Sequence, residues 1–253
     1  MTKPRVQETT TGIQGEFDVQ AYDQMMRTLR DRGWMETDLL IKSGMTSGHA
    51  LEIGPGPGYL GLEWLKKTIG THLTGVDISP GMITLAEKNA REYDLLDRVT
   101  YSLGDARALS FPDGRFDAVF SNGSLHEWED PGTILREAYR VLRRGGRLLV
   151  SDLRRDMLPP EKLFLRIMTK PKAMKKGLLS SIASSYTPRE VRALLLSANL
   201  EGWEVKGNAL GLVIRAQRRD RPGLRIPQRL QRAVARYLPG PSQRPSFADY
   251  GTG

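Results

Sequence analysis

Short apolar runs alternate along the chain with longer stretches in which apolar residues recur every three or four positions. The short runs are typical of buried strands, and the longer stretches are typical of helices that present one face to a core. This alternation continues from about residue 49 to residue 152. It predicts an α/β fold in which helices cover both faces of a parallel sheet.

The pattern assigns five strands and several helices to this part of the chain. The predicted strands are residues 49–53, 73–78, 99–103, 117–121 and 148–151. The predicted helices are residues 59–69, 80–93 and 130–142, preceded by two helices at 17–32 and 36–43. The last helix of the first set is expected to stop at Arg144-Gly145-Gly146.

The first strand runs into a turn in which Gly54, Gly56 and Gly58 alternate with prolines. Glycine adopts backbone angles that other residues avoid, so the chain can turn sharply here from strand to helix and leave backbone N–H groups uncovered. Uncovered N–H groups bind the anionic or polar parts of ligands, and the missing Cβ atoms allow close approach. We therefore expect a nucleotide-like ligand at this turn.

Acidic residues follow the carboxyl ends of the next two strands, at Asp77 and Asp105. Neighbouring strands of a doubly wound sheet end at one crevice, so we expect Asp77 beside the glycine turn, where its carboxylate can accept both hydroxyls of a ribose. The alternative for Asp77 is a residue of the strand-end turn. Met82 and Ile83, in the first turn of the next helix, are expected to flank a flat base. Tyr22, on the first helix, is expected either to cover the ligand or to belong to the core.

Four segments carry a resemblance to a known family, namely 52–58 (EIGPGPG), 75–79 (GVDIS), 104–106 (GDA) and 140–146 (RVLRRGG). They resemble the class I S-adenosylmethionine-dependent methyltransferases, close to the branch of the ubiquinone and menaquinone biosynthesis methyltransferases. The resemblance implies a Rossmann-like sheet of seven strands, mostly parallel with an antiparallel last strand, and S-adenosyl-L-methionine as the cofactor. It also implies two further strands, which the chain offers at 203–205 and 211–216.

The resemblance implies a role for each matching residue. Asp77 is expected to hold the ribose, Asp105 with Ala106 to recognise the adenine, and Asn122 to lie near the transferable methyl. The glycines are expected to shape the turn around the methionine part of the cofactor, with support from Glu52. Pattern and resemblance together give these candidate cofactor-binding residues: Tyr22, Glu52, Gly54, Gly56, Gly58, Asp77, Ile78, Met82, Asp105, Ala106 and Asn122.

A dinucleotide site is the main alternative for the glycine turn. Residues 56–61 also match the Gly-x-Gly-x-x-Gly pattern, and Asp77 follows at a distance that suits a dinucleotide ribose. Three features favour the methyltransferase over a dinucleotide enzyme: the acid at Glu52, the GDA segment at 104–106, and the paired strands near the end of the described pattern.

Composition narrows the class of protein. The chain has 253 residues, a formal net charge of +9 and no cysteine, which excludes disulfides and thiolate metal sites. No apolar run approaches the roughly 20 residues of a membrane-spanning helix, and the polar N-terminal residues contain no signal-peptide core. We therefore expect a soluble cytoplasmic protein, with residues 1–15 as a loose arm.

The positive charge is concentrated in two segments. Residues 154–176 hold eight basic and two acidic residues, and residues 215–244 hold nine basic and one acidic residue. The rest of the chain holds 21 basic and 26 acidic residues. This distribution predicts a separate surface for an anionic protein partner or an anionic membrane, and the alternative is plain solvated charge. No nucleic-acid-binding motif is present.

The chain is expected to divide into an N-terminal arm with cap helices at 1–43, a methyltransferase domain at 44–216 and a basic, proline-rich tail at 217–253. The domain contains a basic helical insertion at 153–185, a region that usually covers the acceptor pocket in the resembled family. We expect one amphipathic helix there, which continues over residues 170–179. Its apolar residues are expected to form either a pocket wall or a packed surface helix: Leu163, Phe164, Ile167 and Met168.

The tail contains one expected amphipathic helix, residues 228–238, with a stripe of arginines beside its apolar residues. Such a helix is expected to dock on a partner, an anionic membrane or the chain's own core.

The function predicted from these features is transfer of the sulfonium methyl to a small, partly apolar acceptor through an O, N or C atom. An acceptor hydroxyl or weakly acidic carbon would need a base, and His126 in the loop after the fourth strand is the candidate, with a structural role as its alternative. His49 and His72 are expected to be structural, and no cluster suits a metal. Two other functions stay open, namely methylation of RNA or protein, and cofactor binding without catalysis as a partner protein.

Overall fold

The computed structural model describes residues 4–6, 16–200 and 202–219, and the side chains of all but 16–18 among them. The strands are β1 (His49–Ile53), β2 (His72–Asp77), β3 (Val99–Leu103), β4 (Phe116–Asn122), β5 (Leu142–Leu153), β6 (Glu204–Gly207) and β7 (Gly211–Gln217). The helices are α1 (Glu16–Asp31), α2 (Thr37–Lys42), α3 (Tyr59–Lys66), α4 (Pro80–Glu92), α5 (Pro131–Val141), α6 (Pro159–Met168), α7 (Met174–Ser184) and α8 (Pro188–Ser197).

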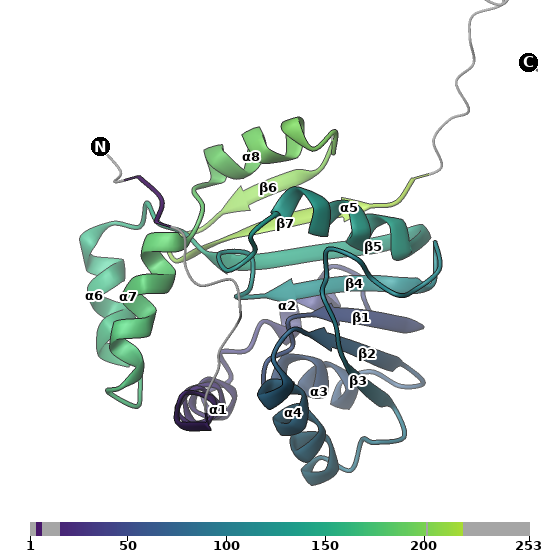
Figure 1. Cartoon of the computed structure of the whole chain (residues 1–253), viewed down its shortest axis with the longest axis horizontal. Coiled ribbons are helices and arrows are strands. Elements are labelled where there is room, and N and C mark those ends of the chain that lie inside the picture. The colour runs from purple at the N-terminus through teal and green to yellow at the C-terminus, as the bar shows by residue number, and fades with distance from the viewer. Residues whose placement is uncertain (1–3, 7–15, 201, 220–253) are drawn as a thin grey trace, which may run out of the picture. The chain divides into compact units, whose positions relative to one another are not determined.

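The strands form one seven-stranded sheet in the order β3-β2-β1-β4-β5-β7-β6 (Figure 1). The pairs β1–β2, β2–β3, β1–β4 and β4–β5 are parallel, whereas β7 is antiparallel to both β5 and β6. The predicted fold class is therefore confirmed. The strand order reverses at β1, and a crevice forms at such a switch point beyond the carboxyl ends of the strands.

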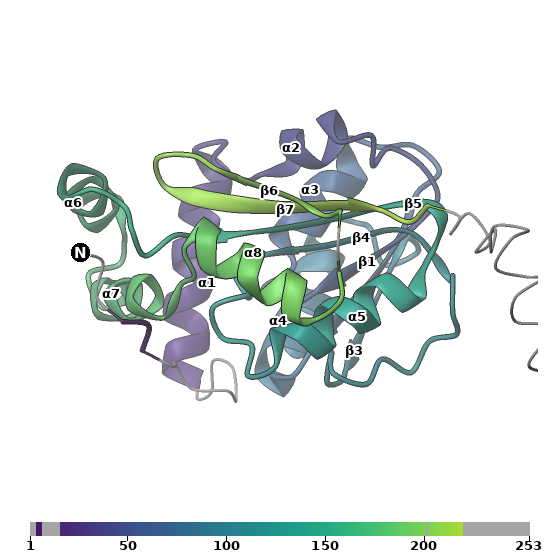
Figure 2. The ribbon, with the colours of Figure 1, turned by 90° about the horizontal axis from the view of Figure 1, so that it is seen from above.

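Two apolar clusters fix the helices to the two faces of the sheet. One cluster joins α5 and α8 to the sheet through side chains such as Leu135 and Leu195. The other joins α2, α3 and α4 to the opposite face, with Trp64 of α3 fully buried at its centre. Figure 2 shows α2 and α3 on one side of the sheet and α5 and α8 on the other. Burial on both faces explains the apolar centres of β4 and β5, at residues 118–120 and 148–150.

Helix starts follow the expected capping chemistry. The Ser79 hydroxyl accepts a hydrogen bond from the N–H of Met82, and the Asp130 carboxylate accepts one from the N–H of Thr133. Proline occupies the first helical position after each cap, where its missing N–H costs nothing. These caps place the first turn of α4 directly after the tip of β2.

The structure corrects two boundaries. α5 ends at Val141 and β5 begins at Leu142, so the glycines predicted to stop a helix lie inside a strand. Gly145, with φ of 76°, donates its N–H to the carbonyl of Arg218, and the N–H of Arg218 donates to the carbonyl of Gly146. These two hydrogen bonds extend the sheet past the expected turn. The insertion forms two helices, α6 and α7, because Pro171 lacks the N–H that a continuous helix requires.

The described part of the chain contains no helix that is long and apolar enough to cross a membrane. The expected tail helix at 228–238 and most of the expected N-terminal arm lie outside the described residues.

Candidate active site

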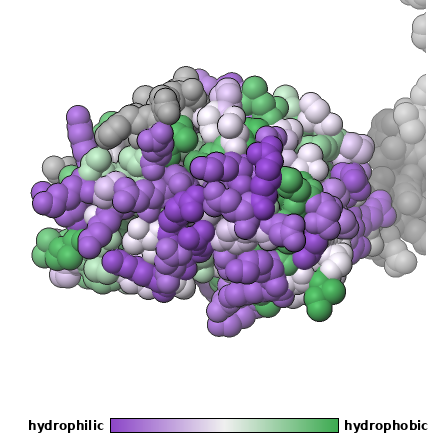
Figure 3. Space-filling view, turned by 90° about the horizontal axis from the view of Figure 1, so that it is seen from below, coloured by the Kyte–Doolittle hydropathy of each residue, from purple (hydrophilic) through white to green (hydrophobic). Residues whose placement is uncertain are grey.

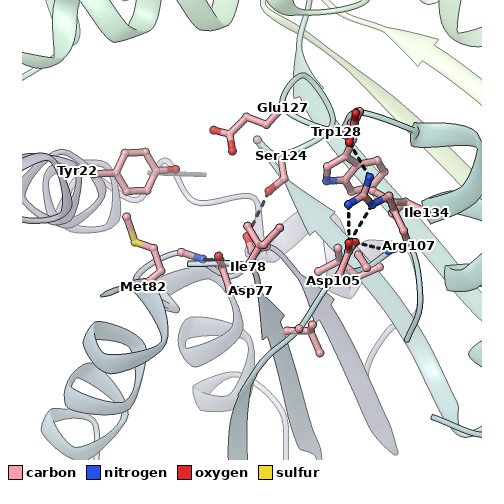
Figure 4. A pocket seen from close by; sticks show the side chains of 18 residues that line it. Tyr22, Asp77, Ile78, Met82, Asp105, Arg107, Ser124, Glu127, Trp128 and Ile134 are labelled. Atoms are coloured by element: carbon pink, nitrogen blue, oxygen red, sulfur yellow. Dashed lines mark hydrogen bonds and ion pairs between the residues drawn. The ribbon is translucent and has the colours of Figure 1, made fainter. Parts of the chain in front are cut away.

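A cavity of about 300 Å³ lies at the carboxyl ends of β1 to β4, within the roughly 300–1,000 Å³ usual for small-molecule sites. Its wall comes from α1, the turn between β1 and α3, the start of α4, and the loops 104–107 and 123–129. Figure 4 shows Tyr22, Met82 and Asp77 at one end, and Asp105, Arg107 and Ile134 at the other. The cavity is thus elongated between a helix-covered end and a loop-covered end.

The glycine turn has the backbone geometry that the sequence predicted. Gly54, Gly56 and Gly58 have φ values of 66°, 53° and 83°, which L side chains rarely adopt. A Cβ on Gly54 would lie 2.4 Å from Ser124 Oγ, and a Cβ on Gly58 would lie 2.5 Å from Tyr101 Oη. Gly54 and Gly56 line the cavity, whereas Gly58 lies behind it as the N-cap of α3.

Asp77 lies at the tip of β2 and joins two loops. Its Oδ2 accepts a hydrogen bond from the N–H of Gly56 at 3.0 Å, and its Oδ1 accepts one from the N–H of Ser79 at 2.9 Å. Burial raises the pKa of Asp77, and the backbone N–H groups act in the opposite direction. Each carboxylate oxygen offers about two lone pairs, so both oxygens retain capacity for a ligand's hydroxyls.

An ion-pair bridge closes the other end of the cavity. Arg107 Nε donates to Asp105 Oδ2 at 2.9 Å, and Arg107 Nη1 donates to Glu129 Oε2 at 2.6 Å. The bridge connects the loop after β3 to the loop after β4, and Arg107 holds the pKa of Asp105 below its usual range. Asp105 and Ala106 line the cavity as predicted, with the carboxylate of Asp105 already engaged by Arg107. Ile134 adds an apolar surface beside them.

Tyr22 extends from α1 into the helix-covered end of the cavity (Figure 4). Burial raises the pKa of the Tyr22 hydroxyl, and the negative charges of Glu127 and Asp77 raise it further. The hydroxyl therefore remains protonated. Ile78 and Met82 line the same end of the cavity and supply apolar surface.

Two predicted cofactor residues lie outside the cavity wall, in addition to Gly58. Glu52 is 2% exposed beneath the turn, where a Cβ on Gly61 would lie 2.3 Å from its Oε2. Burial, followed by the charge of Asp77, raises the pKa of Glu52 well above its usual range. The Asn122 side chain donates to Glu36 Oε2 at 3.1 Å and to Ser151 Oγ at 2.9 Å.

His126 also lies behind the wall and is 5% exposed. Its Nδ1 is 3.0 Å from both carboxylate oxygens of Asp152, and its backbone N–H donates to Asp152 at 2.7 Å. A carboxylate accepts only, so Nδ1 carries the proton and Nε2 is the nitrogen that takes one up. Nε2 lies 3.9 Å from Oε1 of Glu127, whose side chain lines the cavity.

The other two histidines, His49 and His72, are the first residues of β1 and β2, at the end of these strands opposite to the cavity. His49 Nε2 is 2.8 Å from Thr74 Oγ1, and its ring packs edge-on against Phe116. Within the described residues, no group of His, Asp and Glu could hold a metal ion.

Sequence reasoning did not single out several residues of the cavity wall: Arg107, Ser124, Glu127, Trp128, Glu129 and Ile134. Glu127, Trp128 and Ser124 belong to the loop that follows the carboxyl end of β4, so their position after a strand end is the signal that could have found them. Arg107 is recognisable only through its partner Glu129, which is 22 residues away and meets it in the fold.

The comparison with known proteins agrees with this geometry. A protein-family model described as "Methyltransferase domain" matches residues 51–150. The demethylmenaquinone methyltransferase of Bacteroides fragilis is 29% identical over 182 residues, which are 68% of this chain and 73% of that protein. The 27-O-demethylrifamycin SV methyltransferase of Amycolatopsis mediterranei is 35% identical over 135 residues, which are 52% of this chain and 48% of that protein.

The chain carries a methyltransferase domain and is similar to the class I S-adenosylmethionine-dependent methyltransferases. A solved structure of a putative S-adenosyl-L-methionine-dependent methyltransferase from Methanococcus maripaludis has the same fold, with a TM-score of 0.64. It is 20% identical and covers 88% of this chain and 100% of that chain. The methyltransferase resembles the branch that acts in ubiquinone and menaquinone biosynthesis, so the dinucleotide alternative is set aside.

The cavity of this methyltransferase suits its cofactor, S-adenosylmethionine. The carboxylate of Asp77 offers acceptors for hydroxyls, the turn at Gly54 and Gly56 permits close approach, and Ile78 and Met82 offer apolar surface.

Proposed function

We propose that this methyltransferase transfers the methyl of S-adenosylmethionine to a small, partly apolar acceptor. The observation that carries the proposal is the cavity around the tip of Asp77, lined by Tyr22 on one side and by the loop 123–129 on the other. The two relatives described above are named for a demethylmenaquinone and for a demethylrifamycin, both small molecules. These names support a small acceptor over RNA or protein.

We infer that Asp77 holds the ribose and that the turn at Gly54 and Gly56 accommodates the methionine part of the cofactor. We assign the adenine to the end of the cavity that is lined by Asp105, Ala106 and Ile134. Asn122 is assigned to the neighbourhood of the methyl group. Glu52 and Gly58 support the turn from behind. When bound, the cofactor supplies a methyl group on a sulfonium, which is already activated for transfer. The protein mainly orients the reactants and excludes water, and orientation contributes roughly 7–11 kcal/mol in well-aligned cases.

His126 is proposed as the base for an acceptor hydroxyl or a weakly acidic carbon. Asp152 orients the ring and fixes its proton on Nδ1, which leaves Nε2 to accept a proton. Glu127 stands between this nitrogen and the cavity, so we assign it the relay position between acceptor and His126.

The ribose assignment is tested by replacing Asp77 and measuring cofactor affinity by calorimetry. Asp77→Asn removes the negative charge and a charge-assisted hydrogen bond, so we expect about 10- to 100-fold weaker binding. Asp97→Asn, at an exposed acid far from the cavity, is the matched control and should bind as the wild type does. Equal affinity in the Asp77→Asn and wild-type proteins would contradict the assignment.

The acceptor class is tested with cofactor that carries a labelled methyl group. We expect the label in an organic-extractable product when the enzyme is incubated with small hydroquinones or phenols. Label that accumulates instead in added RNA or in acidic protein would overturn the proposal for a small acceptor.

The basic segments add a partner to the proposed function. We propose that the insertion, residues 153–185, contacts an anionic partner, for which the sequence allowed a protein or a membrane. The division into cap helices at 1–43, a domain at 44–216 and a tail at 217–253 is part of the same proposal. It assigns Tyr22 to the cap and the rest of the cavity wall to the domain.

A further inference from the structure

An apolar patch stands exposed on the insertion and on the turn between α1 and α2. Its side chains are 44–65% exposed, and we define the α6–α7 patch by them: Trp34, Leu158, Leu163, Phe164, Ile167 and Leu179. α6 has no buried residue at all. The sequence allowed Leu163, Phe164 and Ile167 as a pocket wall or as part of a packed helix. Leu163, Phe164 and Ile167 are exposed, Met168 is partly buried, and none of the four lines the cavity described above.

The patch has a defined arrangement. Leu163, Phe164 and Ile167 follow one another at helical spacing on one side of α6. The Phe164 ring lies 6.4 Å from the ring of Trp34, and Arg32 stacks over Trp34 at 5.0 Å. Two segments far apart in the sequence therefore build one surface. Figure 3 shows hydrophobic side chains beside hydrophilic ones at the end of the body where α6 and α7 lie.

Cations surround the patch without acidic partners. Residues 157–186 contain six basic residues and one acid, Glu161. None of the six forms an ion pair with any residue that the structure describes, whereas Arg154 and Arg155 just before them are paired. The six basic residues are Lys162, Arg166, Lys170, Lys172, Lys175 and Lys176. Long basic side chains beside exposed apolar ones are typical of helices that lie at the surface of an anionic bilayer.

The charge of the α6–α7 patch and its apolar side chains together indicate which kind of partner can bind it. A second copy of this chain would bring six more cations to the interface, and the tail at 215–244 carries nine basic residues against one acid. Both would repel the patch. Nucleic acid matches the charge, but its bases stack on aromatic rings, whereas this patch is mostly aliphatic, with four leucine and isoleucine side chains. Anionic lipid matches both the charge and the apolar side chains.

We propose that the α6–α7 patch docks this methyltransferase on an anionic membrane surface. The patch lies beyond the carboxyl ends of the strands, the edge of the sheet that holds the cavity (Figure 1). α7 contacts α1, which carries Tyr22 into the cavity. Docking thus turns the helix-covered end of the site toward the lipid, and an apolar acceptor enters from there. This last consequence rests on the proposed function, whereas docking itself does not.

The test is sedimentation of the full chain with vesicles of phosphatidylcholine, with and without phosphatidylglycerol, and without cofactor or acceptor. We expect binding to the anionic vesicles, with weaker binding as salt rises, because salt screens the cations. Two variants remove one component each: Phe164→Ser with Ile167→Ser, and Lys172→Glu with Lys176→Glu. Each should weaken binding about ten-fold or more.

Matched controls carry the same changes elsewhere on exposed positions. Ile69→Ser with Leu196→Ser alters two exposed apolar residues, and Lys88→Glu with Arg91→Glu alters two exposed basic residues. Both controls should bind vesicles within about two-fold of the wild type. Cofactor calorimetry on every variant reports the fold and the active site separately, so the loss of vesicle binding is distinguishable from a failure of the proposed function.

Three results would overturn the proposal. Undiminished vesicle binding by both patch variants would assign the membrane contact to another segment. Equal binding to neutral and anionic vesicles would remove the charge argument. A wild-type dimer in light scattering that becomes a monomer in the patch variants would show that a second copy covers this face.

Discussion

At the scale of single residues, Glu52 is an acid enclosed by the core. Its Oε2 has no hydrogen-bond partner among the described residues, and the N–H of Gly61 donates to the carboxyl group. Burial and the nearby charge of Asp77 favour the protonated form, so the pKa of Glu52 is higher in the folded state than in the unfolded state. Folding is therefore linked to proton uptake at this position.

Glu52→Gln tests this linkage. A group with a raised folded-state pKa stabilises fully below its unfolded pKa, and this contribution is lost as pH rises through the folded-state pKa. The glutamine of the variant does not titrate and so has no such loss. The free energy of unfolding of the variant, relative to that of the wild type, should therefore increase as pH rises above about 4.5, by at most about 1.4 kcal/mol per pH unit. Denaturant titrations across the pH range measure the difference. A difference that stays constant with pH would contradict the linkage.

His126 allows a second prediction at this scale. If an acceptor proton leaves by way of Glu127 and His126, His126→Gln should lower kcat about 10²- to 10⁴-fold, since glutamine takes up no proton. Cofactor affinity should stay unchanged, because His126 does not line the cavity. The measurement is kcat together with a calorimetric Kd, and Asp152→Asn should reproduce part of the loss. Full activity of His126→Gln would assign the ring a structural role.

At the scale of elements, a few polar anchors hold α6 and α7 to the rest of the domain. Arg155 is 5% exposed and donates to the carbonyl of Ser185, directly after α7, and to Glu190 of α8. Arg5 donates to the carbonyl of His126 at 2.8 Å and lies 4.2 Å over the Tyr186 ring. α6 buries no residue and α7 buries one apolar side chain, Ile182, so these anchors supplement limited apolar packing.

Arg155→Met should therefore increase local opening of α6 and α7 while the sheet stays intact. Removing hydrogen bonds to a charged group costs about 1.5–3 kcal/mol, which corresponds to roughly ten-fold or faster local opening. Hydrogen exchange should speed up in residues 159–184 and stay unchanged in β1 and β4. Arg154→Met is the control, because Arg154 pairs with Asp156 and Asn208 and not with α7 or α8. Equal exchange in all three proteins would refute this role of Arg155.

The elements also show what the sequence determines by itself. β1, the glycine turn and the Asp77 tip were predictable, because apolar runs, glycines at positive φ and strand-end acids are local signals. The caps at Ser79 and Asp130 were local in the same way. The path of β5 through Gly145 and Gly146 was not predictable, because it depends on hydrogen bonds with Arg218, more than 70 residues away. The outward orientation of Leu163 and Phe164 depends equally on where α6 is placed.

At the scale of the whole molecule, one ligand contacts segments from Tyr22 to Ile134 if it fills the cavity. A ligand that binds only the folded state stabilises it by mass action, by about 2.7 kcal/mol at 100 times its Kd. For a protein of this size, we expect the melting temperature to rise by roughly 5–10 °C with saturating cofactor. Thermal scans measure the shift, which should shrink in Asp77→Asn and persist in Asp97→Asn.

The bridge from Asp105 through Arg107 to Glu129 bears on turnover. It spans the loop-covered end of the cavity with side chains that are 39–59% exposed, so dissolved ions weaken it. Demethylated cofactor can leave at either end of the cavity, past this bridge when it opens or past Tyr22. If release past the bridge limits turnover, we therefore expect turnover to rise with ionic strength, because dissolved ions weaken these exposed ion pairs.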